Sequence, residues 1–166
     1  MVISGCALPA QASVIETGET KEPPNNDSWV YPAKIKVNKF YPWSTAQFTI
    51  KVHNGSPGEK TYSVTYRNPD HIGEGYVIAP GVTKERVKIV NPNPILEGYE
   101  TRNILVTIQP TQENRTAWWW VKWSWHYLGQ WINPDPVMEF WINVEDTQQR
   151  GMVREALGIR VFLEVK

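Results

Sequence analysis

The sequence of 166 residues contains a single cysteine, Cys6, and no surplus of charge of either sign. One cysteine cannot form an internal disulfide, and it excludes a metal site built from several thiolates. Lys and Arg together number 17, as do Asp and Glu, so the formal net charge is zero. A neutral chain lacks the basic surface that binding to nucleic acid normally requires. No apolar run approaches the roughly 20 residues of a spanning helix, so we expect no membrane span.

Motifs that carry catalysis or cofactor binding are also missing. The sequence contains no GxSxG, P-loop, GxGxxG, HExxH or CxxC pattern. His53, His71 and His126 are far apart in the chain, and none has a second histidine at ligand spacing. Glu and Asp residues could assemble into a hydrolytic pair in space, but nothing in the sequence selects one pair. We therefore predict a non-enzymatic protein with no cofactor, no metal and no catalytic residues.

The first residues resemble a lipoprotein attachment signal in part. Ile3-Ser4-Gly5-Cys6 resembles a bacterial lipobox, in which the cysteine would carry the lipid. Neither a basic segment nor an apolar stretch of about 7 to 15 residues precedes it, and a signal peptide needs both. We therefore expect an uncleaved start. Residues 7–29 are small, polar and proline-containing without periodicity, which predicts that residues 1–29 form an extended arm.

From residue 30 onward, apolar residues alternate with polar ones, which is the pattern of half-buried β-strands. Residues 46–53 and 61–66 alternate in this way on either side of the turn sequence HNGSPG. The pattern recurs in about eight short segments separated by turn residues. A turn within DTQQRGMVREAL is the one helical candidate. Because long helical crossovers are missing, the spacing favours an antiparallel sandwich over residues 30–166.

Two stretches resemble the PapD-like and major-sperm-protein-like immunoglobulin domains. KIKVNKFYPWSTAQFTIKVHNGS reads as a strand, a turn and a strand that ends in Asn-Gly. ERVKIVNPNPILEGYETRNILVTI reads as a strand, a loop with proline, a turn with glycine and an alternating strand. The resemblance covers residues 30–166 and implies an all-β, immunoglobulin-like antiparallel β-sandwich. Such folds mostly bind, assemble or space other molecules, and fold alone does not set the function.

Tryptophan is frequent: the chain has nine, and the segment NRTAWWWVKWSWHYLGQW is the richest in them. Where this segment alternates, one face is apolar throughout and is expected to face the core. Trp118 and Trp120 then project outward. The same alternation sends Trp141 outward in the segment MEFWINV, and Phe162 outward in the last strand. These four aromatic residues are the candidate binding residues.

Outward rings that cluster would form an apolar patch of the kind that binds partners. Trp is a favoured anchor at protein–protein contacts. The rings could instead be covered by the N-terminal arm or by the loop 67–82. Stacking on nucleic acid is disfavoured, because the basic groove that normally accompanies it is missing.

We predict a structural or adhesive component of a larger assembly that has other protein subunits as partners. Its predicted form is a virion or particle-surface protein, such as a capsid decoration or tail-associated module. The alternative is a secreted or lipid-anchored carbohydrate-binding module that binds glycans through Trp118, Trp120 and Trp141. In that case the location would be the bacterial cell surface, with Cys6 as the lipid anchor.

Overall fold

The computed structural model describes residues 13–16, 27–40, 44–69, 71, 76–78, 84–109, 137–148 and 156–165. Within these ranges the chain forms strands and no helix, which confirms the all-β prediction. The strands follow in chain order: β1 (Ser13–Glu16), β2 (Trp29–Tyr31), β3 (Lys34–Phe40), β4 (Ala46–His53), β5 (Lys60–Arg67), β6 (Tyr76–Ile78), β7 (Val87–Ile89), β8 (Ile95–Leu96), β9 (Thr101–Ile108), β10 (Val137–Asp146) and β11 (Ala156–Val165). The part of the chain that the structure describes holds no helix long and apolar enough to cross a membrane.

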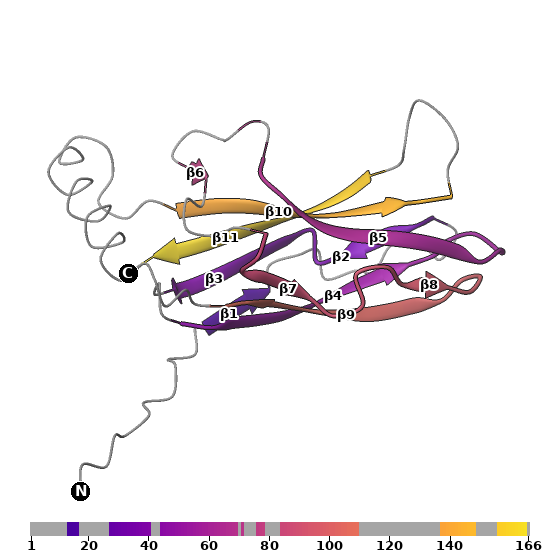
Figure 1. Ribbon diagram of the computed structural model, residues 1–166, viewed down its shortest axis with the longest axis horizontal. Helices are drawn as coiled ribbons and strands as arrows, with labels where there is room; N and C mark the ends of the chain where they lie inside the picture. Colours follow the sequence, from indigo (N-terminus) through magenta and orange to yellow (C-terminus); the bar gives the residue numbers. More distant parts are fainter. Residues whose placement is uncertain are drawn as a thin grey trace, which may run out of the picture.

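The strands form two sheets, and Figure 1 shows β10, β11 and β5 packed above β4, β9 and β7. The larger sheet has the order β1-β3-β11-β10-β5-β8, with β6 beside β10, and the smaller sheet has the order β2-β4-β9-β7. Most neighbouring strands are antiparallel, as predicted. The prediction is corrected at two places, because β3 runs parallel to β11 and β6 runs parallel to β10.

The alternation read from the sequence identifies the core. Each predicted inward side chain named here is at most 4% exposed: Ile35, Val37, Ala46, Phe48, Ile50, Val52, Tyr62, Val64, Ile104, Val106, Ile108, Phe140, Ile142, Val144, Ile159, Val161 and Leu163. Complete burial of one such Val, Leu, Ile or Phe side chain contributes about 1.5–3 kcal/mol. The core therefore determines which residues of each strand are left for the outer faces.

Part of the predicted arm belongs to the larger sheet. Strand β1 pairs antiparallel with β3, so that Ser13 lies opposite Asn38 and Glu16 lies opposite Ile35. Strand β2 already begins at Trp29, whose side chain is buried. An edge strand is held through backbone hydrogen bonds, so it needs no apolar pattern in its sequence. The division into an arm at 1–29 and a domain at 30–166 stays a prediction.

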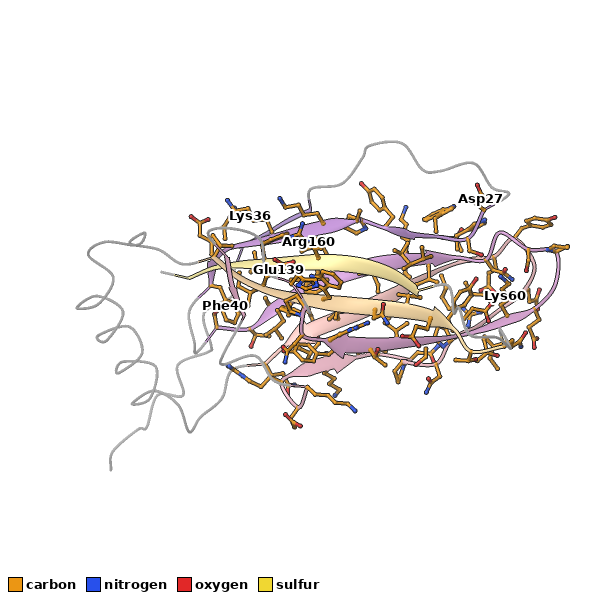
Figure 2. All side chains as sticks on the ribbon, turned by 90° about the horizontal axis from the view of Figure 1, so that it is seen from above. Asp27, Lys36, Phe40, Lys60, Glu139 and Arg160 are labelled. Atoms are coloured by element: carbon orange, nitrogen blue, oxygen red, sulfur yellow. The ribbon has the colours of Figure 1, made fainter. Side chains whose placement is uncertain are left out.

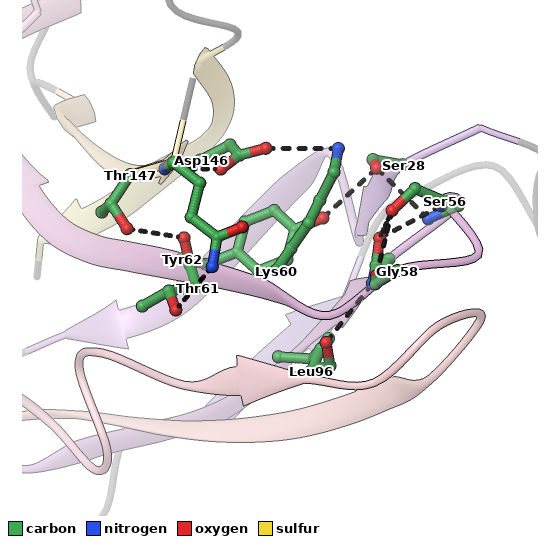
Figure 3. Close-up of polar contacts among 12 residues, drawn as sticks. Ser28, Ser56, Gly58, Lys60, Thr61, Tyr62, Leu96, Asp146 and Thr147 are labelled. Atoms are coloured by element: carbon green, nitrogen blue, oxygen red, sulfur yellow. Dashed lines mark hydrogen bonds and ion pairs between the residues drawn. The ribbon is translucent and has the colours of Figure 1, made fainter. Parts of the chain in front are cut away.

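Three loops meet at one end of the sandwich, around Asn54, which is fully buried. Figure 3 shows Ser28, Ser56, Gly58 and Leu96 of these loops close together. The amide nitrogen of Asn54 donates to the backbone carbonyls of Gly58, Leu96 and Glu97, at 2.7, 3.3 and 2.9 Å. The amide oxygen accepts from the backbone N–H and the hydroxyl of Ser56, at 3.1 and 2.8 Å. We call residues 27–28, 54–59 and 95–100 the Asn54 end. One side chain thus ties two of its loops together.

Two glycines permit the close approach of these loops. A Cβ at Gly55 would overlap the backbone of Asp27, and a Cβ at Gly98 would overlap the backbone of Pro57. A Cβ at Gly58, in contrast, would meet nothing within 4 Å. Only the first two positions therefore require glycine for reasons of space.

We expect Gly98→Ala to lower the free energy of unfolding by about 2 kcal/mol or more, because the backbones of two loops must separate. Gly58→Ala is the matched control and should change it by less than about 0.5 kcal/mol. Urea denaturation of the two variants measures the difference. Equal losses in both would contradict the packing of the loops.

Candidate functional site

The outer face of the larger sheet carries charged and aromatic residues from three adjacent strands. On β10 and β11, Glu139 lies opposite Phe162 and Trp141 lies opposite Arg160. On β3, Lys34 lies opposite Arg160. These five residues, Glu139, Trp141, Arg160, Phe162 and Lys34, form the Glu139 cluster. Figure 2 shows Glu139 and Arg160 close together on neighbouring strands.

The Glu139 carboxylate is the centre of the cluster, although it lies on an outer face. Its side chain is 0% exposed. The Arg160 guanidinium donates from Nε to Oε1 at 2.7 Å and from Nη2 to Oε2 at 3.0 Å. The Trp141 indole Nε1 also donates to Oε1, at 2.6 Å. Such two-pronged, charge-assisted hydrogen bonds are among the strongest in proteins, and they fix direction as well as distance.

The electrostatic surroundings keep Glu139 ionised. Burial by itself would raise the pKa of the Glu139 carboxyl. The hydrogen bonds from Arg160 and Trp141, together with the positive charges of Arg160 and Lys34, outweigh burial and hold this pKa below its ordinary value. Three N–H donors bind the carboxylate, and these bonds hold the Arg160 and Trp141 side chains in fixed directions.

Phe162 lies on the outer face, as the alternation predicts, but its ring is only 2% exposed. The Lys34 ammonium lies 4.6 Å from the ring centre, and the Arg160 guanidinium lies 4.9 Å from it. Cations at this distance are attracted to the face of an aromatic ring. The expectation that Phe162 presents its ring to solvent is therefore wrong. The ring supports the two cations above it.

Trp141 keeps part of its surface accessible. Its side chain is half-buried, and its ring lies beside Gly158, where an added Cβ would be 3.9 Å from Cε3. That distance is an ordinary van der Waals contact, so the ring would also fit beside a residue with a Cβ at position 158. Trp118 and Trp120 lie outside the described residues. A binding role for the three tryptophans and for Phe162 stays a prediction.

Two important members of the cluster, Glu139 and Arg160, were not among the predicted site residues. Strand alternation correctly places both on the outer face, where charged residues are ordinarily solvated. They are diagonal neighbours across β10 and β11, a position from which long side chains can reach each other. A carboxylate and a guanidinium, each spaced by two from an aromatic residue on its own strand, are the signal that could have found them.

Of the two histidines that the structure describes, His53 is buried. Its Nδ1 and the Thr101 hydroxyl are 2.8 Å apart, and its ring stacks on Trp29 with ring centres 5.0 Å apart. His71 is exposed, and His126 lies outside the described residues. Within the described ranges, no three His, Cys, Asp or Glu side chains gather in a way that could hold a metal ion.

No protein-family model and no curated protein matches the sequence. Solved structures match it in fold. PapD-like domain 7 of human CEP192 is 10% identical, with a TM-score of 0.53 over 90% of this chain and 92% of that chain. The YadV chaperone is 9% identical, with a TM-score of 0.51 over 84% of this chain and 52% of that chain. The CsuC–CsuE chaperone–tip adhesion subunit complex of Acinetobacter baumannii pili is 9% identical, with a TM-score of 0.50 over 84% and 57%.

The fold is therefore a PapD-like, immunoglobulin-like β-sandwich, as the resemblance in the sequence implied. The chain spans little more than half the length of the matched chains in the YadV and CsuC–CsuE structures, and nearly all of the CEP192 domain. Of these three structures, one is named as a chaperone and one as a complex that contains a chaperone.

The predicted role as a virion, capsid-decoration or tail-associated protein is contradicted. The structures named above are a chaperone, a chaperone–adhesion subunit complex from chaperone–usher pili, and a PapD-like domain, and none is a virion protein. The same comparisons contradict the alternative of a carbohydrate-binding module. They also contradict both predicted locations, the virion or particle surface and the bacterial cell surface with a lipid anchor at Cys6. The error arose because an immunoglobulin-like fold is shared by proteins of many functions.

The depressed pKa of Glu139 makes a prediction about stability and pH. A group of this kind stabilises the native state above the pKa that it has when unfolded, and the contribution is lost as the pH falls through the lower, folded pKa. We expect Glu139→Gln to lower the free energy of unfolding by about 1.5–3 kcal/mol near pH 7, because it removes the charge that Arg160 and Trp141 bind. The difference in this free energy between the variant and the native protein should become smaller below about pH 4.

Chemical denaturation at a series of pH values measures this difference. Glu164→Gln is the control, because Glu164 pairs with Lys36 at 3.5 Å on the same face but is 32% exposed. Pairs of that kind contribute about 0–1 kcal/mol. A loss in Glu139→Gln that stays constant down to acidic pH would show that the ionised carboxylate is not the source of the stabilisation.

Proposed function

We propose that the chain is a chaperone-like, protein-binding module that holds a segment of another polypeptide on the outer face of its larger sheet. The observation that carries the proposal is the attachment of the Trp141 indole and the Arg160 guanidinium to one fully buried carboxylate. Tryptophan and arginine are two of the residue types that contribute most to affinity at protein–protein contacts. In this chain, Trp141 and Arg160 lie opposite each other on two neighbouring strands of the larger sheet.

The rigidity of this pair supports a binding role. Ordering a flexible side chain at an interface costs about 0.5–1.5 kcal/mol, and a side chain that is already held avoids that cost. The Arg160 side chain is 46% exposed although two of its nitrogens bind Glu139. The half-buried Trp141 ring lies beside it, so the pair offers an apolar surface next to a positive charge.

The comparisons support a protein as the partner. One matched solved structure is a complex between the chaperone CsuC and a tip adhesion subunit, which is itself a protein. We extend this class of partner, a protein subunit, to the present chain. The binding role predicted for Trp118 and Trp120 is kept as part of the proposal, because strand alternation predicts that both side chains project outward.

Site-specific photo-crosslinking in cells that make the protein tests the proposal. A photo-reactive residue replaces Thr65, which is exposed on the outer face of the larger sheet, opposite Asn143. The control position is Gln47, which is exposed on β4 of the smaller sheet. We expect a defined protein adduct from position 65 and none from position 47.

The substitution Trp141→Ala should reduce the adduct about tenfold or more, because it removes an aromatic anchor. Leu105→Ala, at an exposed position of β9, is the matched substitution in the smaller sheet and should leave the adduct unchanged. Thermal unfolding of both variants shows that each remains folded. Adducts from position 47 alone, or an adduct insensitive to Trp141→Ala, would refute a binding face at the Glu139 cluster.

A further inference from the structure

The Asn54 end exposes an aromatic ring on a backbone that is held in place. Tyr99 is 54% exposed and Ile95 is 51% exposed, the two highest values among the exposed large apolar side chains of the described residues. The Tyr99 backbone N–H donates to the Ser56 carbonyl at 3.1 Å. Tyr99 also has a φ of 61°, which few residues other than glycine adopt. The turn therefore keeps a tyrosine where glycine would be easier to accommodate.

The loops that surround Tyr99 are tied to one another from several sides. The Glu97 N–H donates to the Glu100 carboxylate at 2.8 Å, and this bond closes the turn below the ring. The Gly55 N–H donates to the Ser28 hydroxyl at 3.2 Å. That hydroxyl lies 3.2 Å from the Tyr62 hydroxyl on β5 (Figure 3). With the contacts of Asn54, these bonds hold the three loops in one arrangement.

The charge of the Asn54 end is negative. Asp27, Glu59 and Glu97 are exposed, and their carboxylates form no ion pair with any described residue. Among the described residues, Lys60 pairs with Asp146 at 3.2 Å and Arg102 pairs with the carboxylate of Glu100, so these two cations do not neutralise the three carboxylates. The surface thus combines an exposed tyrosine with uncompensated negative charge.

We propose that the Asn54 end is a second docking surface, which binds a basic segment of a partner protein with Tyr99 as its anchor. A Lys or Arg side chain gains both from stacking on a tyrosine ring and from a nearby carboxylate. Loops at one end of an immunoglobulin-like sandwich are well placed for binding, and these loops include Tyr99, Ser56, Gly55 and Asn54, residue types that are frequent in binding loops.

This surface is separate from the Glu139 cluster. Figure 2 shows Asp27 and Lys60 at one end of the long axis, while Glu139 and Arg160 lie toward the other end. The two proposals can therefore fail independently. A change at Tyr99 should leave the photo-crosslink at position 65 unaffected.

Titration with synthetic peptides, followed by amide chemical shifts of the full chain, tests the proposal. The probe is a short peptide of alternating Lys and Leu residues, and the comparison peptide has Glu in place of each Lys. We expect the Lys peptide to shift the amide signals of Gly55, Ser56, Gly98 and Tyr99 in a saturable way. The Glu peptide should leave these signals in place, because like charges repel.

The deciding variant is Tyr99→Gly, which removes the ring and keeps a residue that accepts the positive φ. It should remain as stable as the native protein and bind the Lys peptide about tenfold more weakly. Asn91→Gly is the matched control, because Asn91 has a φ of 57° but lies outside the Asn54 end. It should bind as the native protein does.

Three results would overturn the proposal. The first is shifts that spread over the acidic surface generally and persist in Tyr99→Gly. The second is a lack of saturable binding by either peptide. The third is self-association of the chain in sedimentation that Tyr99→Gly abolishes, since the occupant of the surface would then be a second copy rather than a basic partner.

Discussion

The alternation of side chains along β10 and β11 is the constraint on which the rest of the structure depends. Phe140 and Ile142 on β10, and Ile159 and Val161 on β11, are fully buried in the core. Because successive side chains of a strand point to opposite faces, the residues between them must occupy the outer face. A shift of either strand by one residue would carry its whole apolar set out of the core. The position of the Glu139 cluster follows from that register.

The cost of enclosing a carboxylate explains the form of the cluster. An isolated buried charge is strongly destabilising, and a buried pair contributes little net stability even when its geometry is good. The interaction of Glu139 with Arg160 and Trp141 therefore matters chiefly for orientation. It converts two long side chains, which would otherwise move freely on a sheet surface, into a fixed pair. At the Asn54 end, a buried neutral amide has a similar effect, because its hydrogen bonds hold two loops together rather than two side chains.

The fold could be predicted from the sequence to a greater extent than the site. Alternation is a local property, so the inward positions of β4, β9, β10 and β11 were readable directly. Strand β1 could not be predicted from alternation, because an edge strand is held by backbone hydrogen bonds and needs no apolar pattern. Phe162 was placed on the correct face, but the sequence does not show that its ring is buried with the cations of Lys34 and Arg160 against it. The hydrogen bonds that Glu139 accepts come likewise from partners at neighbouring positions, and a sequence does not show the pairing register that brings them together.

The most direct test of this account is an NMR titration of the Glu139 carboxyl carbon and the Trp141 indole N–H in the same sample. The account predicts that Glu139 titrates below the ordinary pKa of a glutamate, and that the indole signal moves with the same midpoint, because Nε1 donates to the ionised carboxylate. A Glu139 pKa at or above the ordinary value for glutamate, together with an indole signal that does not change as Glu139 titrates, would contradict the account. Trp141 and Arg160 would then not be held by a buried charge.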